Sequence, residues 1–90
     1  MKYFDWDIEK NKKLKKERGV SFEEAVLAMK GGDLLYAGKN PNQSKYPNQS
    51  LFIVKMREYC FLVPFVRDDE KCFLKTIIPS RKATKKYLSK

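Results

Sequence analysis

Two basic residues near the C-terminus have the types and spacing best suited to a chemical role. Lys75 lies on an expected strand, and Arg81 follows six positions later, in the expected first turn of a helix. A guanidinium group holds phosphate oxygens through paired hydrogen bonds, and free N–H groups at a helix start also attract anions. We therefore predict a phosphate-binding site around Arg81, joined by Lys75 if both share an uncovered sheet face. The alternatives are an ion pair of Arg81 with Glu23 or Glu24 and a solvated Lys75.

The charge of the chain points to an acidic partner. The 90 residues carry a net charge of +9, and residues 79–90 hold five bases and no acid. Such a concentration favours a polyanion or an acidic protein. Lys82, Lys85 and Lys86 would attract a nucleic-acid backbone without reading its sequence. The lysines of residues 10–18 are interpreted as a solvated helix face.

The residue types that are absent exclude several classes of site. The chain has no histidine, which excludes Ser-His-Asp triads, imidazole acid–base pairs and His-ligated metal sites. Cys60 and Cys72 lack metal-ligand spacing, so we expect no metal and no cofactor. The N-terminus has no apolar signal region, and the longest apolar run is far shorter than the ~20 residues of a membrane-spanning helix. With two free thiols, these features predict a cytoplasmic protein that avoids membranes.

The elements that must position these residues form a single expected domain, residues 1–90, of the α+β class. Hydrophobic periodicity and capping signals predict the order β-α-α-β-β-β-β-α, a small antiparallel meander sheet with two N-terminal helices and one C-terminal helix on one of its faces. Asp7 and Ser21 are expected to cap the first two helices, Gly19 to end the first, and Ser80 to cap the last. The expected strands are residues 3–6, 33–37, 51–57, 60–66 and 72–78, and the expected helices are 8–18, 22–30 and 81–89.

The strand pattern carries three further expectations. Pro64 lacks a ladder donor, so its strand needs a bulge or a free edge. A turn near Asp69 would place Cys72 opposite Val66, far from Cys60, so no disulfide is expected. Phe73 is expected in the core, whereas Phe65 and Tyr87 are candidates for stacking on bases, and the alternative for Tyr87 is to anchor the last helix to the sheet.

Three segments of the chain carry a resemblance to a known family. They are Phe4-Asp5-Trp6-Asp7, the run Arg-Gly-Val-Ser-Phe-Glu-Glu-Ala at 18–25, and Ile-Ile-Pro-Ser-Arg-Lys-Ala-Thr at 77–84. In this order they resemble the BrnT-type toxins of bacterial type II toxin–antitoxin systems. The resemblance implies a RelE-like fold, endoribonuclease activity that inhibits translation, and a cognate antitoxin, usually a small ribbon-helix-helix DNA-binding protein. RNA is then the substrate, and the ribosome is a further candidate partner.

RNA cleavage of this kind needs a base, an acid and cations near the phosphate, but no metal. Without histidine, the acid–base candidates are carboxylates, a lysine or a tyrosine: Asp68, Asp69, Glu70, Lys75, Tyr46 and Tyr59. We predict as catalytic Arg81, Lys75, Arg67 and Glu70, and as RNA-binding Lys82, Lys85, Lys86 and Lys45. The alternative for Glu70 is a plain turn carboxylate.

Two other functions stay open. Arg67 stands where the family often has Glu, and Thr76 where many members have Arg, which favours a toxin relative without catalysis that binds nucleic acid or an antitoxin. The other is a structural partner that masks an acidic protein.

Overall fold

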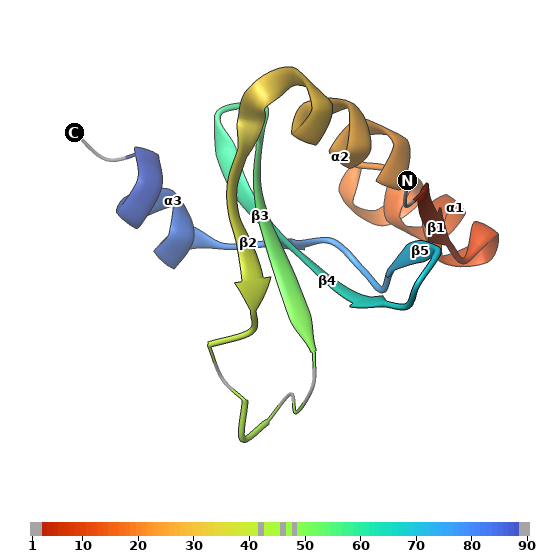
Figure 1. Cartoon of the computed structure of the whole chain (residues 1–90). Helices are drawn as coiled ribbons and strands as arrows, with labels where there is room; N and C mark the ends of the chain where they lie inside the picture. The colour runs from red at the N-terminus through yellow and green to blue at the C-terminus, as the bar shows by residue number, and fades with distance from the viewer. Residues whose placement is uncertain (1–2, 42, 46, 48, 89–90) are drawn as a thin grey trace.

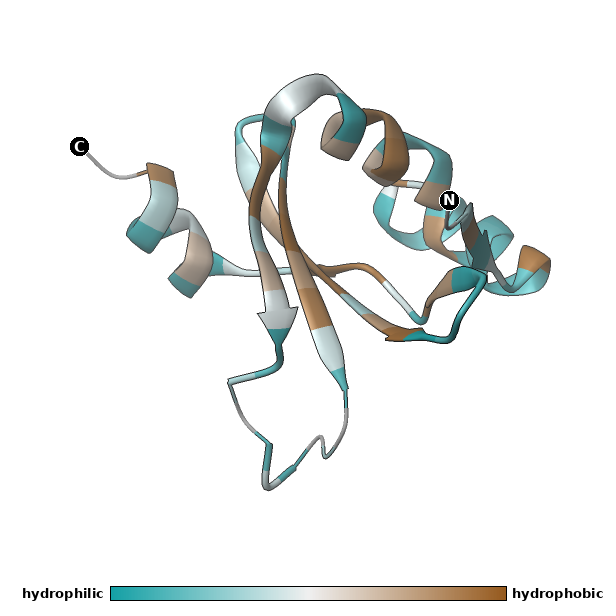
Figure 2. Cartoon of the chain, viewed as in Figure 1, coloured by the Kyte–Doolittle hydropathy of each residue, from teal (hydrophilic) through white to brown (hydrophobic). Residues whose placement is uncertain are grey.

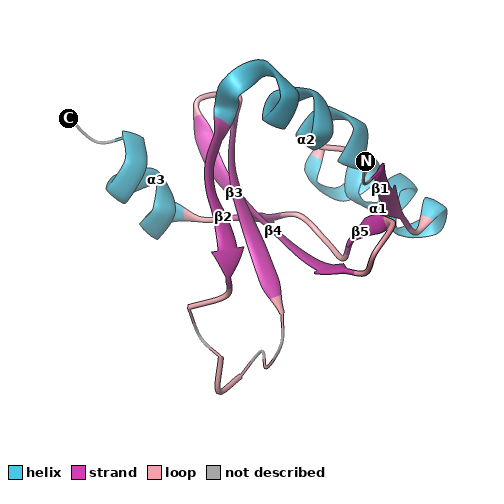
Figure 3. Cartoon of the chain, viewed as in Figure 1, coloured by secondary structure: helices cyan, strands magenta, loops and turns pink. Residues whose placement is uncertain are grey.

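The described residues form an α+β fold of three α-helices and one six-stranded sheet (Figures 1 and 3). The computed structural model describes residues 3–41, 43–45, 47 and 49–88. Tyr46 and Ser89, which entered the expectations above, lie outside these residues. The helices are α1 (Ile8–Arg18), α2 (Phe22–Ala28) and α3 (Arg81–Leu88), and a π-helical turn (Met29–Asp33) follows α2. The strands are β1 (Tyr3–Trp6), β2 (Leu34–Lys39), β3 (Ser50–Met56), β4 (Tyr59–Arg67), β5 (Lys71–Leu74) and β6 (Ile78–Pro79).

The sheet is mixed, whereas the strand pattern predicted an antiparallel one. Its order is β1-β5-β4-β3-β2, with β6 paired to β4 beside β5. The meander pairs are antiparallel, but β1 runs parallel to β5, with Tyr3 opposite Lys71 and Trp6 opposite Leu74. The expected meander is therefore confirmed, and the expectation of a purely antiparallel sheet is wrong. β1 lies at the edge of the sheet, beside β5. Because α1 and α2 follow β1, the chain crosses over before it enters the meander, and such crossovers permit parallel pairing.

Helices cover both faces of the sheet, which corrects the expectation of one covered face. The larger core joins α1 and α2 to one face through Leu14, Phe22 and Ala25, which meet Val54, Val63 and Leu74 among others. A smaller cluster on the other face packs Ala83 of α3 against Leu51, Ile53 and Cys60. Hydrophobic colour accordingly runs along the central strands in Figure 2, between α2 and α3. The alternation of β3 supplies both faces, because successive side chains of a strand point in opposite directions.

Pro64 explains why the expected strand 72–78 is interrupted. β4 is continuous through Pro64, whereas the segment that pairs with it is divided into two strands, β5 and β6. The carbonyl of Pro64 accepts from the N–H of Lys75 at 2.8 Å, so this residue faces the β5–β6 edge. The N–H and C=O of one strand residue point to the same side, so the missing donor of Pro64 also faces this edge. The ladder is lost there, and Lys75 and Ile77 no longer share a strand face.

The helix boundaries follow their local capping signals. The Asp7 carboxylate accepts from the N–H groups of Glu9 and Lys10, and Gly19 closes α1 with a left-handed φ of 71°. The Ser21 hydroxyl accepts from the N–H of Glu24 at 3.1 Å. These three expected caps are confirmed. α2 ends at Ala28 rather than near Lys30, because the chain widens into the π-helical turn.

A buried asparagine joins α1 to the start of α2. Asn11 is 5% exposed, and its Oδ1 accepts from the N–H of Phe22 at 2.8 Å. Its Nδ2 donates to the Glu23 carboxylate at 2.7 Å. One amide therefore satisfies a free N–H group at the start of α2 and fixes the angle between the two helices. Since helix-interior asparagines usually face water, the sequence did not identify this role.

We expect Asn11→Ala to lower the free energy of unfolding by about 1–3 kcal/mol, because it leaves the buried Phe22 N–H without its acceptor. Urea unfolding followed by circular dichroism measures the change. Lys13→Ala, at an exposed position of the same helix, is the control and should change stability by less than about 0.5 kcal/mol. Equal effects of the two substitutions would contradict the bridging role.

The side-chain amide of Asn11 also makes the free energy of unfolding depend on pH. The hydrogen bond from Asn11, with a backbone bond and Lys15 adding to it, lowers the pKa of Glu23 below 4.5. A lowered folded-state pKa gives a stabilisation that is complete above the unfolded pKa and is lost as pH falls through the folded value. We expect Glu23→Gln to destabilise the protein at pH 7, and this destabilisation to shrink as the pH falls below 4.5 and through the folded-state pKa. If the free energies of unfolding of the wild type and of Glu23→Gln differ by the same amount across this pH range, the assignment is wrong.

The turn between β3 and β4 holds two residues in a strained conformation. Arg57 and Glu58 have φ of 56° and 64°, the left-handed region that two-residue hairpin turns require and that glycine or asparagine favours. Arg57 also binds both carboxylate oxygens of Glu24, at 3.0 and 2.9 Å, and so ties the hairpin to α2. This contact with Glu24 is a structural reason for an arginine at a position where glycine or asparagine would be less strained.

We expect Glu58→Gly to raise the free energy of unfolding by about 0.5–1 kcal/mol, because glycine adopts positive φ without a steric penalty. Glu58→Ala, which removes the same carboxylate but keeps Cβ, is the matched control and should not stabilise. Urea midpoints measure both. A gain from Ala equal to that from Gly would show that charge, not backbone strain, governs this position.

Both cysteines are free, as the sequence predicted, and both are buried. Cys72 lies opposite Arg67 rather than Val66, a shift of one residue in the turn. Burial raises the pKa of the Cys60 thiol.

In the described part of the chain, no helix is long and apolar enough to cross a bilayer.

Candidate nucleic-acid interface

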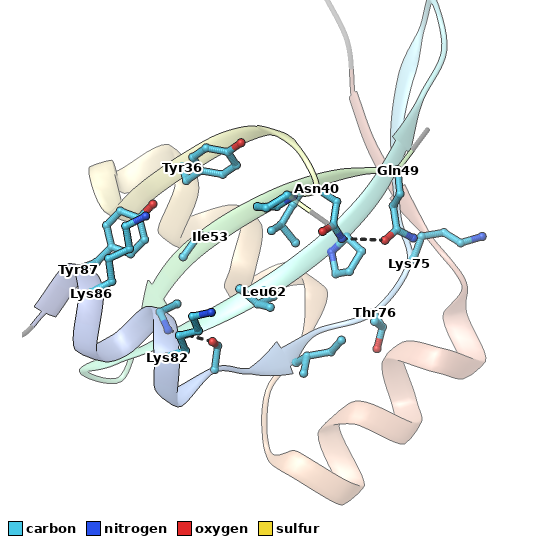
Figure 4. Close-up of a pocket in the computed structure, with 16 residues that line it drawn as sticks. Tyr36, Asn40, Gln49, Ile53, Leu62, Lys75, Thr76, Lys82, Lys86 and Tyr87 are labelled. Carbon is cyan, nitrogen blue, oxygen red and sulfur yellow. Dashed lines mark hydrogen bonds between the residues drawn. The ribbon is translucent and has the colours of Figure 1, made fainter. Parts of the chain in front are cut away.

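A groove of about 520 Å³ lies on the face of the sheet that carries α3 (Figure 4). The apolar floor comes from β3 and β4 and includes Leu51, Ile53 and Leu62. Lys75 and Gln49 lie at one end of the view in Figure 4, and Lys86 and Tyr87 at the other. The described lining residues are Tyr36, Asn40, Pro41, Gln49, Leu51, Ile53, Leu62, Pro64, Lys75, Thr76, Ile78, Ser80, Lys82, Ala83, Lys86 and Tyr87.

The charged residues that line this groove are all basic. Three lysines, Lys75, Lys82 and Lys86, contribute to it, and none of its described lining residues is acidic. None of the three lysines forms an ion pair with a described residue. Two aromatic side chains, Tyr36 and Tyr87, complete the walls. Lysines attract phosphates, and rings over an apolar floor can receive unstacked bases, so these residue types suit a single nucleic-acid strand.

Hydrogen bonds to β4 hold α3 in its position beside the groove. The Ser80 hydroxyl caps the helix by accepting from the N–H of Ala83 at 3.1 Å, which confirms the expected cap. The N–H of Ser80 donates to the carbonyl of Cys60 at 2.9 Å, and the N–H of Cys60 donates to Thr84 Oγ1 at 2.9 Å. With Ala83 buried against the sheet, the helix presents Lys82 and Lys86, four residues apart, on the groove side.

The β2–β3 end of the groove is built from amides and one tyrosine. Asn40 Nδ2 donates to Gln49 Oε1 at 3.3 Å, and the backbone N–H of Asn40 donates to the carbonyl of Gln49 at 2.9 Å. The Tyr36 hydroxyl donates to the carbonyl of Lys39 at 2.9 Å. A Cβ on Gly38 would lie 3.0 Å from this hydroxyl oxygen, so glycine makes room for the ring. Tyr36 and Asn40 were not predicted as groove residues, because only the β2–β3 pairing brings them there.

Of the predicted site residues, the structure brings Lys75, Lys82 and Lys86 to the groove. Arg81 and Lys85 are exposed on α3 and are not among the lining residues. The alternative for Arg81, an ion pair with Glu23 or Glu24, is absent from the described residues. Those two carboxylates bind Lys15 and Arg57 instead. Lys45 is exposed in the β2–β3 connection and does not line the groove.

Arg67 and Glu70 lie apart from the groove, at the turn between β4 and β5. Arg67 is exposed and lines a separate hollow of about 300 Å³ with Val66, Lys71 and others. Glu70 is exposed in the turn. The four predicted catalytic residues therefore do not line one common cavity. No group of three or more Asp, Glu or Cys side chains in the described ranges is arranged to hold a metal ion.

The aromatic residues divide differently from the expectation. Phe65 is 4% exposed and stacks on Phe52 with ring centroids 3.9 Å apart, so it is unavailable to a base. Tyr87 packs beside the smaller cluster and also lines the groove, so it both anchors α3 and faces the groove. Phe73, expected in the core, is only half-buried.

Comparison of this chain with protein-family models, with curated proteins and with solved structures found no match.

Proposed function

We propose that this protein is a metal-independent endoribonuclease and acts as the toxin of a type II toxin–antitoxin pair, as its resemblance to BrnT-type toxins implies. The observation that carries the proposal is the groove beside α3. It joins three lysines and two tyrosines over an apolar floor, without a described acidic lining residue. Lysines attract the phosphates of an RNA strand, and rings and apolar side chains receive its unstacked bases. An acidic substrate is also what the net charge of +9 favours.

The chemistry requires no group beyond those near the groove. The ribose 2′-oxygen attacks the adjacent phosphorus, a 2′,3′-cyclic phosphate forms, and the bond to the 5′-oxygen breaks. The 2′-hydroxyl loses a proton, and the leaving oxygen gains one. In this proposal Lys75 and Lys82 stabilise the negative charge of the transition state. Tyr87 and Tyr36 line the groove and are the tyrosines that we propose for the proton transfers, for which Tyr36 must exchange its hydrogen bond to the carbonyl of Lys39.

The remaining predicted residues act outside the groove in this proposal. Arg81 is exposed next to Lys82 in the first turn of α3, so its guanidinium can bind a phosphate that flanks the groove. Lys85 and Lys45 add general attraction to the backbone. Arg67 and Glu70 would contribute only if RNA extends to the β4–β5 turn.

A second candidate function is a binding module without catalysis. The absence of a carboxylate from the described groove lining favours it, since a general base is then limited to lysine or tyrosine. Such a module would hold RNA or an antitoxin in the same groove.

One pair of assays tests the proposal. Purified, folded protein is incubated with end-labelled single-stranded RNA in EDTA, and the products are separated on a denaturing gel. Binding of the same RNA with 2′-O-methyl groups, which cannot be attacked, is measured by fluorescence anisotropy. The proposal predicts both binding and cleavage, with a cyclic phosphate on the product. Binding without cleavage would support the module. If the protein neither binds nor cleaves RNA, both candidate functions are wrong.

The proposal also includes a partner and a location. The protein would act in the cytoplasm, where translation occurs, and a cognate antitoxin, usually a ribbon-helix-helix protein, would neutralise it. Growth arrest on expression, relieved by co-expression of the adjacent gene product, is the expected result. Growth that is unaffected by a folded, expressed protein would contradict the toxin role, and dependence on the ribosome would appear as cleavage confined to translated messages.

A further inference from the structure

The floor of the groove continues along β4 beyond the part that α3 covers. Leu62, Pro64 and Val66 are two residues apart on a continuous strand and therefore share one face. Leu62 and Pro64 line the groove, and Val66 is 44% exposed. In Figure 1, α3 lies over one end of the sheet, and β5 and β1 lie away from it. An open stretch of sheet surface thus follows the groove.

Phe73 lies on this open surface between two lysines. Its strand neighbours Cys72 and Leu74 belong to the core on the α1–α2 face, so Phe73 points to the opposite face, where it pairs with Val66. The ammonium groups of Lys71 and Lys75 lie 5.9 and 5.6 Å from the centre of its ring. A half-buried ring with two cations nearby combines the two groups that hold a single strand, a ring for a base and positive charge for its phosphates.

Lys75 connects this surface to the groove. It lines the groove and also lies beside Phe73, and in Figure 4 its ammonium end points outward from the groove. The hollow of about 300 Å³ at the β4–β5 turn is lined by Phe73, Val66 and Arg67 among others. The two hollows therefore flank one lysine on the same sheet face.

The acidic groups near Phe73 already have donors. Asp5 pairs with Lys71 at 3.5 Å. The Asp68 carboxylate accepts from the N–H groups of Glu70 and Lys71, at 2.9 and 2.8 Å. Lys75 forms no ion pair with a described residue, so its charge is available to a phosphate.

We propose that Phe73 is a stacking platform for one unpaired base of a single-stranded RNA, whose backbone passes Lys75 on its way out of the groove. This inference rests on the proposed function for the identity of the ligand, but not on catalysis. A duplex does not fit the site, because its bases are already stacked and paired. The site therefore makes the protein selective for single-stranded RNA that extends past the groove.

The test compares Phe73→Leu, which keeps an apolar side chain but removes the ring, with Phe73→Tyr, which keeps the ring. Affinity for a fluorescein-labelled 2′-O-methyl oligouridine is measured by anisotropy from 50 to 200 mM salt. We expect Phe73→Leu to weaken binding about 5- to 100-fold with an unchanged salt dependence, and Phe73→Tyr to bind as the wild type does. Lys75→Gln should instead lower the slope of log affinity against log salt by about 0.7.

The outcomes separate this inference from the proposed function. If Phe73→Leu, shown to be folded by its urea midpoint, binds RNA as the wild type does while Lys82→Gln/Lys86→Gln does not, the platform is wrong and the groove stands. If the wild type binds duplex as tightly as single strand, the platform is also wrong. If the wild type binds acidic peptide but no RNA, the proposed function and the platform both fail.

Discussion

Replacing Lys75, Lys82 and Lys86 together by glutamine is expected to lower affinity for single-stranded RNA on the order of 100-fold at 0.1 M salt. A lysine–phosphate contact on a single strand releases about 0.7 counterion, so each contact contributes roughly fivefold at this salt concentration. The three lysines are those of the groove beside α3, and the substitutions leave its apolar floor intact. We expect RNA cleavage to fall at least as much, because Lys75 and Lys82 also stabilise the transition state in the proposed chemistry. Anisotropy and single-turnover cleavage measure the two effects.

The matched control replaces three exposed lysines of α1, Lys12, Lys13 and Lys16, by glutamine. Both triple variants lower the net charge from +9 by three. α1 packs on the opposite face of the sheet, through Leu14 in the larger core, so the control tests charge without position. We expect it to lose less than about fivefold in affinity. Equal losses in the two variants would show that RNA responds to total charge and that the groove has no special role.

The second large effect concerns the core that supports the sheet. Phe22→Ala is expected to lower the free energy of unfolding by about 3–5 kcal/mol, because Phe22 is fully buried and its removal leaves a cavity. Phe22 also stacks on Trp6, with ring centroids 5.6 Å apart, and so joins α2 to β1. For a domain of this size such a loss is a large fraction of total stability. Urea unfolding followed by tryptophan fluorescence, which reports on Trp6, measures it.

Leu27→Ala on the same helix is the control for this prediction. Leu27 is 70% exposed, so its truncation removes little buried surface, and we expect a change below about 0.5 kcal/mol. A loss from Leu27→Ala as large as that from Phe22→Ala would mean that α2 packs through a different face from the one described here.

The parts of the fold that the sequence predicts well are those set by neighbouring residues. Asp7, Ser21 and Ser80 cap their helices through bonds to N–H groups only two or three residues away, and Gly19 ends α1 by its own conformation. Such signals act over one helical turn and do not depend on the rest of the chain. The meander strands follow in the same way from alternation and short turns.

The parts that were predicted wrongly depend on contacts between distant segments. Pro64 signals an interrupted ladder, but which partner breaks depends on the edge that its missing donor faces. The parallel pairing of β1 with β5 depends on the path of the chain around α1 and α2. Phe73 was predicted as a core residue from its strand position. It is half-buried because α3 covers only part of the sheet face on which it lies. In the candidate site, Lys82 and Lys86 were predicted from the C-terminal charge and Lys75 from its strand position before Arg81, whereas Tyr36 and Asn40 required the β2–β3 pairing.

The most direct test of the central claim is to locate the RNA on the folded protein. An amide-resolved NMR titration with an uncleavable 2′-O-methyl oligouridine reports this position residue by residue. We expect the largest chemical-shift changes at Tyr36, Leu62, Lys75, Lys82 and Tyr87, all of which line the groove. Changes confined to α1, with the groove residues unmoved, would contradict it.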